Sequence, residues 1–529
     1  MKVELRDPNK IMKLSRLGSF HQSKLSFLRS FLREFKDWEF KRDLLDLNKL
    51  GHGLAIYSFK KDDRVYSLIC FANELNEDER SDRVIATKWD AAFTLHDGVP
   101  SKNDIERLKN EVPKQEVGRL SYKELTLSRA NKSLRVFNHV VESLSNGVQP
   151  DTELLSKVGY LYRTTAVYGS GKFGLADRFR IKNREEIYGP FRLEMMLVYL
   201  VRQFTFDQVN HVAKNKNPKK AVKLDPEISR KLGIGNSTGL GMAPFIVNHP
   251  TLLNNWILAR ETALKEIREI KHIKNEHSNL FKLCLNKSIK NITSWNTDSK
   301  YQQEKIKLLL KDIKIFIHFL ENKFDFSKEF AFNEIYLWLE KNLREECVEY
   351  VVSMMMEPYD DIVNPLINKM SSEEEKYFNI PTNRTVYQLK IILEEKYSKI
   401  LNIDFSKNEN NQNFWFISKN KEEPRLADRF EENGSELEQP LAIARDIKKL
   451  YETLSLHKNS STIDRFLSSN SDLRHVIRRA FIIEKFPYSE IQDNTIGKSI
   501  MPIDMLRLKL SFFGALKFDP KSDKWLRIC

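Results

Sequence analysis

The sequence has few cysteines and no long apolar run. Only four of its 529 residues are cysteine, none within metal-ligand spacing of another, which excludes a disulfide scaffold and a cysteine-based zinc finger. No run of about 18 uncharged apolar residues occurs, so the sequence predicts no membrane-spanning helix. The opening residues carry charges without an apolar stretch behind them, and we expect no secretory signal. These absences predict a soluble, cytoplasmic protein that makes no membrane contact.

Glycine and proline are scarce as well. The 18 glycines and 17 prolines exclude a low-complexity or collagen-like chain, and 41% hydrophobic with 30% charged residues is typical of globular proteins. The formal net charge of +14 suits an anionic partner. However, the basic excess is thinly spread and rich in lysine, which a codon bias toward A and T would also produce. The charge alone therefore leaves open whether it serves a partner.

The spacing of apolar residues predicts a mainly α protein. We expect helix up to about residue 50, strands at 54–59 and 64–71 joined by a polar turn, and a third extended segment at 83–89. Helical spacing dominates from residue 101 onward, beginning with a helix over 122–144. The fold class expected is α+β, with a small antiparallel sheet near the N-terminus. Three regions are expected: 1–150 with the hairpin, 151–285 with two glycine-rich loops, and a helical 286–529.

The first glycine-rich loop, 169–174, matches the pattern G-x-G-x-x-G through Gly169, Gly171 and Gly174. Such glycines let backbone N–H groups approach a phosphate, and Lys172 adds a positive charge. The surrounding residues do not fit a dinucleotide-binding fold, and Phe173 stands where a Walker A loop needs serine or threonine. The loop therefore predicts either an anion-binding loop or a structural turn.

The second glycine-rich loop, 233–241, contains a match to the hydrolase pattern G-x-S-x-G. The polar residues before it and Pro244 after it do not fit the strand and helix that a nucleophile elbow needs. The second glycine-rich loop is therefore interpreted either as a loop that faces a ligand or as a tight structural connection. The residues that would face a ligand are Asn236, Ser237, Thr238 and Gly239.

Charged residues near these loops add further candidates. Glu194 and Arg202 interrupt an apolar helix, where they form either an internal ion pair or the lining of a pocket. Arg163 and Arg178 lie in a stretch that favours arginine, whose planar fork binds carboxylate or phosphate with two hydrogen bonds, although pairing on a helix surface explains them equally well. His249, at a turn, is the preferred histidine for proton transfer.

Metal and cofactor sites leave no pattern in the sequence. There is no H-E-x-x-H motif, and no two histidines stand four residues apart. Asp207 and His211 share a helix face, where a surface pair is the preferred interpretation. We therefore predict no metal site, and the cofactor stays unidentified.

These features favour a cytoplasmic enzyme of unassigned reaction that acts on a small anionic metabolite or uses a phosphate-bearing cofactor. The two glycine-rich loops would meet at a cleft. Arg163, Lys172, Arg178 and Arg202 would contact the anion, and Glu194 or His249 would transfer a proton.

Two other functions remain open. A nucleic-acid-binding protein would use the basic segments 214–223 and 474–479, although neither carries the exposed aromatic residues of a single-strand binding platform. A non-catalytic helical scaffold would use neither the loops nor the basic segments. A homodimer is expected only because that assembly is common among cytoplasmic proteins.

Overall fold

The computed structural model divides the chain into two compact units. Unit 1 contains Met1–Ser26 and Met242–Gly514, and unit 2 contains Phe27–Gly241 and Ala515–Cys529. Both units are therefore discontinuous in sequence. The structure describes residues 2–76, 89–114, 121–164, 183–189, 191–229, 232–236, 249–293, 300–370, 378–407, 443–492, 507–508 and 510–514.

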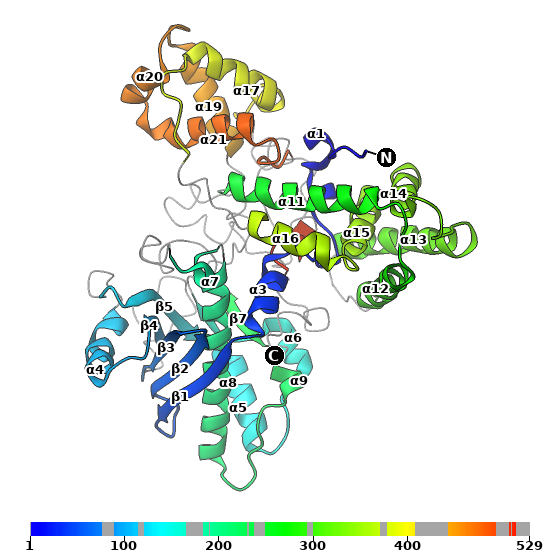
Figure 1. Cartoon of the computed structure of the whole chain (residues 1–529). Helices are drawn as coiled ribbons and strands as arrows, with labels where there is room; N and C mark the ends of the chain where they lie inside the picture. Colours follow the sequence, from blue (N-terminus) through cyan, green and yellow to red (C-terminus); the bar gives the residue numbers. More distant parts are fainter. Residues whose placement is uncertain are drawn as a thin grey trace. The chain divides into compact units, whose positions relative to one another are not determined.

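Unit 2 is built on a seven-stranded mixed sheet with strand order β1-β2-β3-β4-β5-β6-β7 (Figure 1). Neighbouring strands are antiparallel except for the last pair, because β7 runs parallel to β6. The strands are β1 (Glu39–Leu47), β2 (Gly53–Lys61), β3 (Arg64–Ala72), β4 (Ala91–Asp97), β5 (Glu124–Lys132), β6 (Tyr160–Thr164) and β7 (Gly233–Asn236). The described helices of unit 2 are α3 (Phe27–Phe35), α4 (Lys102–Glu111), η2 (Val112–Lys114), α5 (Leu134–Ser145), α6 (Thr152–Val158), α7 (Glu185–Tyr188), α8 (Arg192–Lys216) and α9 (Pro226–Ser229).

The expected small antiparallel sheet is therefore wrong. Two strands lie where the sequence predicted helix, β1 within the first 50 residues and β5 within 122–144. The outermost strand, β1, has mostly exposed side chains, so it lacks the alternation of apolar and polar residues that marks a half-buried strand. The last two strands are short, and β7 has glycine at two of its four positions. The expected strand at 83–89 falls almost wholly outside the described residues.

Helices cover both faces of the sheet. On one face, Phe204 of α8 contacts the rings of Phe93 and Tyr162. On the other face, α4 and η2 contribute to one apolar cluster, whose buried members are Ile56, Ile69, Phe71, Ala92, Leu108, Val112 and Leu127. The almost entirely apolar first half of α8 is explained by this position, since a helix that is apolar around most of its circumference belongs in a core.

Unit 1 is helical in its described parts. The long helix α11 (Pro250–Glu269) is buried along most of its length and packs against α14, α15, α16 and α21 (Figure 1). The remaining helices are α1 (Pro8–Ile11), α2 (Leu14–Leu17), α12 (Asn275–Thr293), α13 (Lys300–Asn322), α14 (Ala331–Asn342), α15 (Glu345–Met355), α16 (Asp360–Met370), α17 (Val386–Leu401), α19 (Ile443–Ser455), α20 (Ile463–Ser469), η8 (Ser471–Leu473) and α21 (Arg474–Lys485). Across the described parts of both units, no helix is both long and apolar enough to span a membrane.

Candidate functional site

The carboxyl ends of β6 and β7, after which the two glycine-rich segments follow in sequence, lie side by side in the sheet. The two strands are parallel, and Thr164, the last residue of β6, is the register partner of Asn236, the last residue of β7. The chain therefore leaves β6 and β7 at neighbouring positions, and each glycine-rich segment follows one of these strands in sequence. In open sheets of parallel strands, ligands bind outside the carboxyl ends of the strands, and among the described strands of this sheet β6 and β7 form the one parallel pair.

Most of the predicted loop residues themselves lie outside the described residues. This applies to Gly169, Gly171, Lys172, Gly174, Arg178, Ser237, Thr238 and Gly239. The second loop begins later than predicted, because Gly233 and Gly235 belong to β7 and Asn236 ends it. A Cβ added at Gly235 would lie 2.8 Å from the ring of Tyr160, so packing against β6 explains this glycine.

Arg163 lies near these carboxyl ends, on a face that it shares with Asn131. It pairs in register with Asn131 of β5 on one side and with Gly235 on the other. Directly opposed residues in a sheet project from the same face. The neighbouring residue Thr164 is fully buried, and its hydroxyl oxygen has no hydrogen-bond partner in the described structure. A buried hydroxyl without a partner is costly, which suits an edge that receives a polar group.

The β4 and β5 strands add polar residues that the sequence analysis missed. Asp90, just before β4, and Asn131 of β5 are both buried. The Asn131 side-chain oxygen accepts from the Asp90 N–H at 3.3 Å, and the Asp90 carboxylate accepts from the Lys132 N–H at 3.0 Å. These two hydrogen bonds join the start of β4 to the end of β5. The guanidinium of Arg129 lies 4.5 Å from the ring centre of Trp89. Burial lowers the pKa of Arg129, because burial disfavours the charged form of the guanidinium. No local motif marks these residues, because only the strand register brings them to Arg163.

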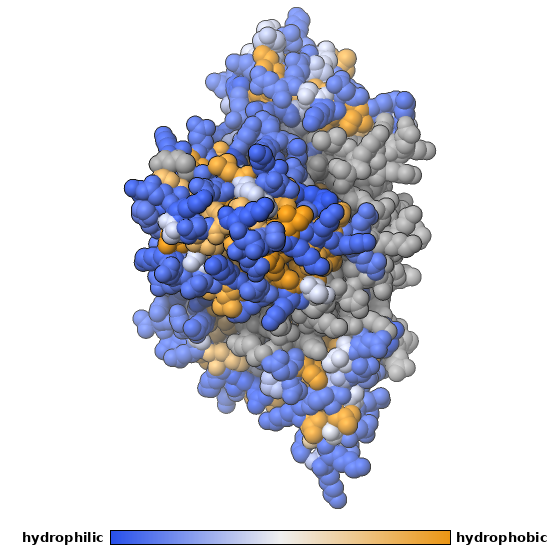
Figure 2. All heavy atoms as spheres, turned by 90° about the vertical axis from the view of Figure 1, so that its right-hand side faces the viewer, coloured by the Kyte–Doolittle hydropathy of each residue, from blue (hydrophilic) through white to orange (hydrophobic). Residues whose placement is uncertain are grey.

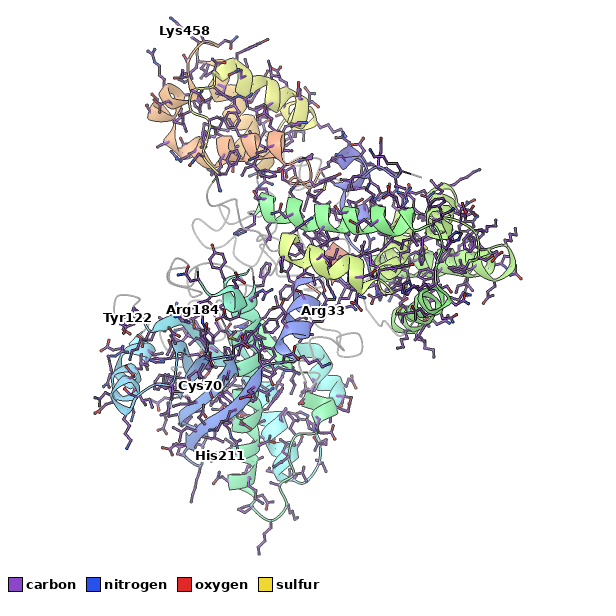
Figure 3. The ribbon with its side chains drawn as sticks, in the orientation of Figure 1. Arg33, Cys70, Tyr122, Arg184, His211 and Lys458 are labelled. Carbon is purple, nitrogen blue, oxygen red and sulfur yellow. The ribbon has the colours of Figure 1, made fainter. Side chains whose placement is uncertain are left out.

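The end of the sheet formed by the start of β3 and the end of β4, toward which β6 and β7 also run, carries arginines whose charges are balanced. Arg184, which is labelled in Figure 3, forms an ion pair with Asp97, and its guanidinium carbon lies 5.6 Å from the ring centre of Tyr66. Arg64 lies 2.9 Å from Glu186, whose carboxylate also accepts from the Tyr66 hydroxyl at 2.5 Å. These contacts dock α7 onto the sheet, and they identify this end as structural.

Arg202 positions β7 rather than lining the edge. Its Nε donates to the carbonyl of Leu232 at 2.5 Å and its NH2 donates to that of Ser229 at 2.7 Å. These bonds fasten the approach to β7 onto α8, and the guanidinium also lies 5.1 Å from the ring of Phe206. Glu194 lies in α8, but its side chain is outside the described residues, so its predicted role is untested. The preferred histidine, His249, precedes α11 in unit 1 and is not one of the unit 2 residues at this edge.

Asp207 and His211 each contact other residues. The Asp207 carboxylate accepts from the Tyr57 hydroxyl at 2.7 Å and lies 3.0 Å from Arg42, which joins α8 to β1 and β2. His211 contacts the carbonyl of Asn48 at 2.9 Å. Burial, followed by the charge of Asp207, raises the pKa of Tyr57, so this phenol stays a donor. Both residues therefore hold the helix on the sheet.

The two basic segments differ sharply. In 474–479, Arg479 is buried and its Nε lies 2.6 Å from the carboxylate of Glu490, while His475 lies 3.4 Å from Asp446. In 214–223, all five lysines are exposed. Burial and pairing remove Arg479 from any surface that binds a polyanion.

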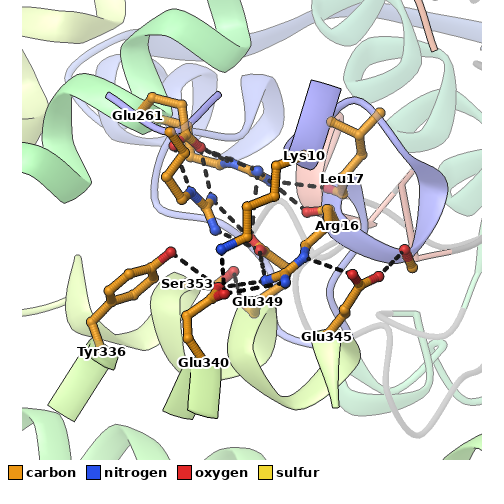
Figure 4. A network of polar contacts seen from close by, with 12 residues as sticks. Lys10, Arg16, Leu17, Glu261, Tyr336, Glu340, Glu345, Glu349 and Ser353 are labelled. Atoms are coloured by element: carbon orange, nitrogen blue, oxygen red, sulfur yellow. Dashed lines mark hydrogen bonds and ion pairs between the residues drawn. The ribbon is translucent and has the colours of Figure 1, made fainter. Parts of the chain in front are cut away.

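A buried ion-pair network holds the N-terminal residues in unit 1 (Figure 4). Arg6 lies 2.6 Å from both Glu261 of α11 and Glu349 of α15, with all three side chains almost fully buried. Burial alone would lower the pKa of Arg6, but these glutamates outweigh it and raise that pKa well above its usual value. The other charged members of the network are Lys10, Arg16, Arg260, Glu340 and Glu345. Arg6, Arg16, Arg260, Glu261 and Glu349 are buried and paired with one another, so they form a structural core, whereas Lys10 and Glu345 are partly exposed at its rim.

No group of three or more histidine, cysteine, aspartate or glutamate side chains among the described residues is arranged to hold a metal ion. The chain matches no protein-family model, no curated protein and no solved structure. The assignment of a function therefore rests on the geometry of the edge.

Proposed function

We propose that the protein is a cytoplasmic enzyme of unassigned reaction that binds a small anionic metabolite or a phosphate-bearing cofactor at the carboxyl edge of β6 and β7. The observation that carries this proposal is the pairing of Thr164 with Asn236 in parallel register, from which both glycine-rich loops continue. The cations Arg129 and Arg163 near this edge suit an anion.

The proposed roles follow from the side chains near the edge. Arg163 would donate to the anion through its planar fork, and Arg129, whose guanidinium carbon lies 4.5 Å from the ring centre of Trp89, would add a second cation. Asp90 and Asn131 fix the two strands and hold this face in place. Lys172 and Arg178 remain predicted contributors, and Glu194 and His249 remain predicted proton-transfer groups. The cofactor and the reaction stay unassigned.

A calorimetric titration tests the proposal, with inorganic phosphate, pyrophosphate and a nucleoside diphosphate as probes of the full chain. We expect at least one probe to bind, and Arg163→Ala to weaken it by about tenfold or more, because a charge-assisted hydrogen bond contributes roughly 1.5–3 kcal/mol. Arg135→Ala, an exposed arginine of α5, is the matched control. Equal affinity in the two variants, or no binding of any probe at millimolar concentration, contradicts the proposal and favours a scaffold.

Nucleic-acid binding through both basic segments is the alternative function. The ion pair of Arg479 with Glu490 weighs against the 474–479 half, whereas the exposed lysines of 214–223 favour the other half. The homodimer is also retained as a proposal, and light scattering of the purified protein tests it.

A further inference from the structure

The connection that follows α8 is an ordered loop rich in lysine, at the lower end of unit 2 in Figure 1. We name residues 214–223 the lysine loop. Three backbone N–H groups fix its course: Asn217 N–H donates to Ala213, Ala221 N–H to Asn217, and Val222 N–H to Leu144, each at 3.0 Å. The last of these bonds ties the loop to the end of α5.

Side chains and a close contact complete this anchoring. The amide of Gln149 donates to the carbonyl of Lys223 at 2.8 Å and accepts from the N–H of Asp225 at 2.9 Å. Gly147 has a φ of +83°, and a Cβ there would lie only 3.1 Å from the Lys220 carbonyl. The backbone of the lysine loop is thus held at both ends, and its lysines project from fixed positions.

The charges of the loop are largely unbalanced. Lys214 donates to the carbonyl of Pro218 at 2.6 Å, and Lys216 lies 3.7 Å from the exposed Glu142. Among the described residues, no acid forms an ion pair with Lys219, Lys220 or Lys223. The sequence has no acidic residue between Asp207 and Asp225.

Like charges repel each other, and lysines on a mobile loop could move apart to reduce this repulsion. Lysines at fixed positions cannot, so their arrangement is unfavourable in the free protein. An anionic partner that spans several lysines offsets this repulsion. Arginine forms a planar fork that selects carboxylate or phosphate geometry, whereas lysine is a point charge that accepts many geometries. Lysines alone therefore suit a repeated anion contacted without sequence selection.

The other side chains of the loop favour a nucleic acid over a membrane. The loop has no aromatic residue, and Val222, its large apolar residue, is 37% exposed. Segments that insert into a membrane interface do so through apolar or aromatic side chains, of which this loop has Val222. The Asn215 amide is occupied by the His211 carbonyl at 2.9 Å, so it is not arranged to read base edges. Figure 2 shows hydrophilic side chains covering the lowest tip of the molecule, where the loop lies.

We infer that the lysine loop is a docking surface for the phosphate backbone of a nucleic acid, contacted independently of its sequence through Lys219, Lys220 and Lys223. This inference does not depend on the proposed anion site, because the two sets of residues are separate. The Arg163→Ala variant should therefore keep its nucleic-acid affinity.

Fluorescence anisotropy of a labelled 30-base-pair duplex DNA, titrated with the full chain, tests this inference. Three phosphate contacts predict that log K falls with log salt at a slope of about −2.7, so affinity drops about 40-fold between 50 and 200 mM salt. The Lys219→Gln/Lys220→Gln/Lys223→Gln variant should lose most of this slope and bind about tenfold or more weakly at 50 mM salt. The control Lys60→Gln/Lys102→Gln/Lys109→Gln removes the same charge from exposed lysines of β2 and α4 and should bind like the wild type.

Three outcomes would overturn the inference. They are no anisotropy change at micromolar protein, an equal loss in both triple variants, and binding to vesicles of anionic phospholipid without binding to DNA. An equal loss would assign the binding to overall charge, and the vesicle result would assign the loop to a membrane surface. Melting temperatures of both variants, expected to match the wild type, separate loss of binding from loss of folding.

Discussion

The ion-pair network of unit 1 and the lysine loop of unit 2 both gather cations, but they do so under opposite conditions. In the network, Arg6 and Arg16 are almost fully buried and each contacts more than one glutamate. In the lysine loop, Lys219, Lys220 and Lys223 are exposed and have no acidic partner among the described residues. Buried charges must be paired to be tolerated, whereas exposed charges can be left for a partner. Burial and pairing, rather than the number of basic residues, distinguish a structural cluster from a binding surface.

Removing Arg6 should produce the largest effect, because it leaves Glu261 and Glu349 buried without their main cation. We expect Arg6→Ala to lower the free energy of unfolding of unit 1 by about 3–5 kcal/mol, measured by urea denaturation. Lys2→Ala, an exposed residue of the same segment, should change it by less than about 0.5 kcal/mol. A loss below about 1 kcal/mol for Arg6→Ala would contradict the structural role of the network.

Arg479 should behave like the network and not like the lysine loop, although it lies in a basic segment. Arg479→Ala leaves the buried carboxylate of Glu490 with the Tyr397 hydroxyl, at 3.2 Å, as its side-chain partner among the described residues. We expect a loss of about 3 kcal/mol in the stability of the C-terminal helices and no change in DNA affinity. The exposed neighbour Arg474 provides the control Arg474→Ala. A change in DNA affinity without a change in stability would show that this helix contributes to DNA binding.

Acid should destabilise the network. Burial alone would raise the pKa of Glu340, but hydrogen bonds from Lys10 and Arg16 outweigh it and lower this pKa to about 2. Likewise, burial would raise the pKa of Glu261, but Arg6 outweighs it and lowers it. A lowered carboxylate pKa stabilises the fold above the unfolded pKa of about 4.3, and this contribution is lost as the pH falls toward the folded pKa.

The urea concentration at the midpoint of unfolding should be measured from pH 7 to pH 3. We expect this concentration to decrease once the pH is below about 5. Glu340→Gln should flatten this dependence, whereas the triple lysine-loop variant should keep the dependence of the wild type. An unchanged pH dependence in Glu340→Gln would show that this carboxylate does not couple protonation to folding.

The smallest effect is expected in the lysine loop itself. Lys219→Gln/Lys220→Gln/Lys223→Gln should leave the free energy of unfolding unchanged or raise it by up to about 0.5 kcal/mol, because it relieves repulsion and breaks no ion pair. The stabilisation should shrink at 1 M salt, where the Debye length is about 3 Å. A loss of 2 kcal/mol or more would mean that these lysines are structural, like Arg6.

Helices with clear apolar spacing could be predicted from the sequence, and strands without alternation could not. The buried helix α8 contains Glu194 and Arg202, the residues that the sequence placed in an apolar helix, and α11 lies in the region of helical spacing, because a wide apolar face repeats at helical spacing in both. The strand β5, Glu124–Lys132, is buried along nearly its whole length, so it shows no alternation and merges with the apolar start of α5. Tertiary packing on both faces, which no local pattern records, decides its structure.

The candidate site was predictable only in part, for the same reason. The glycine-rich loops and Arg163 were identified because their residue types are locally unusual. Asp90, Arg129 and Asn131 were not identified, because they reach the edge through pairing between strands that are distant in sequence. The role of Gly235 could not be predicted either, because the ring of Tyr160 on the neighbouring strand leaves no room for a side chain at this position.

The burial of Arg6 also sets an order of events during synthesis. Its two partners follow 255 and 343 residues later in the chain. At about 5–20 residues per second, a ribosome needs roughly 20–70 seconds to deliver the second partner after Arg6 has emerged. Most of unit 2, the segment Phe27–Gly241, is made well before then. Arg6 can therefore reach its buried position between both glutamates only after Glu349 has been made, although it stands near the start of the sequence.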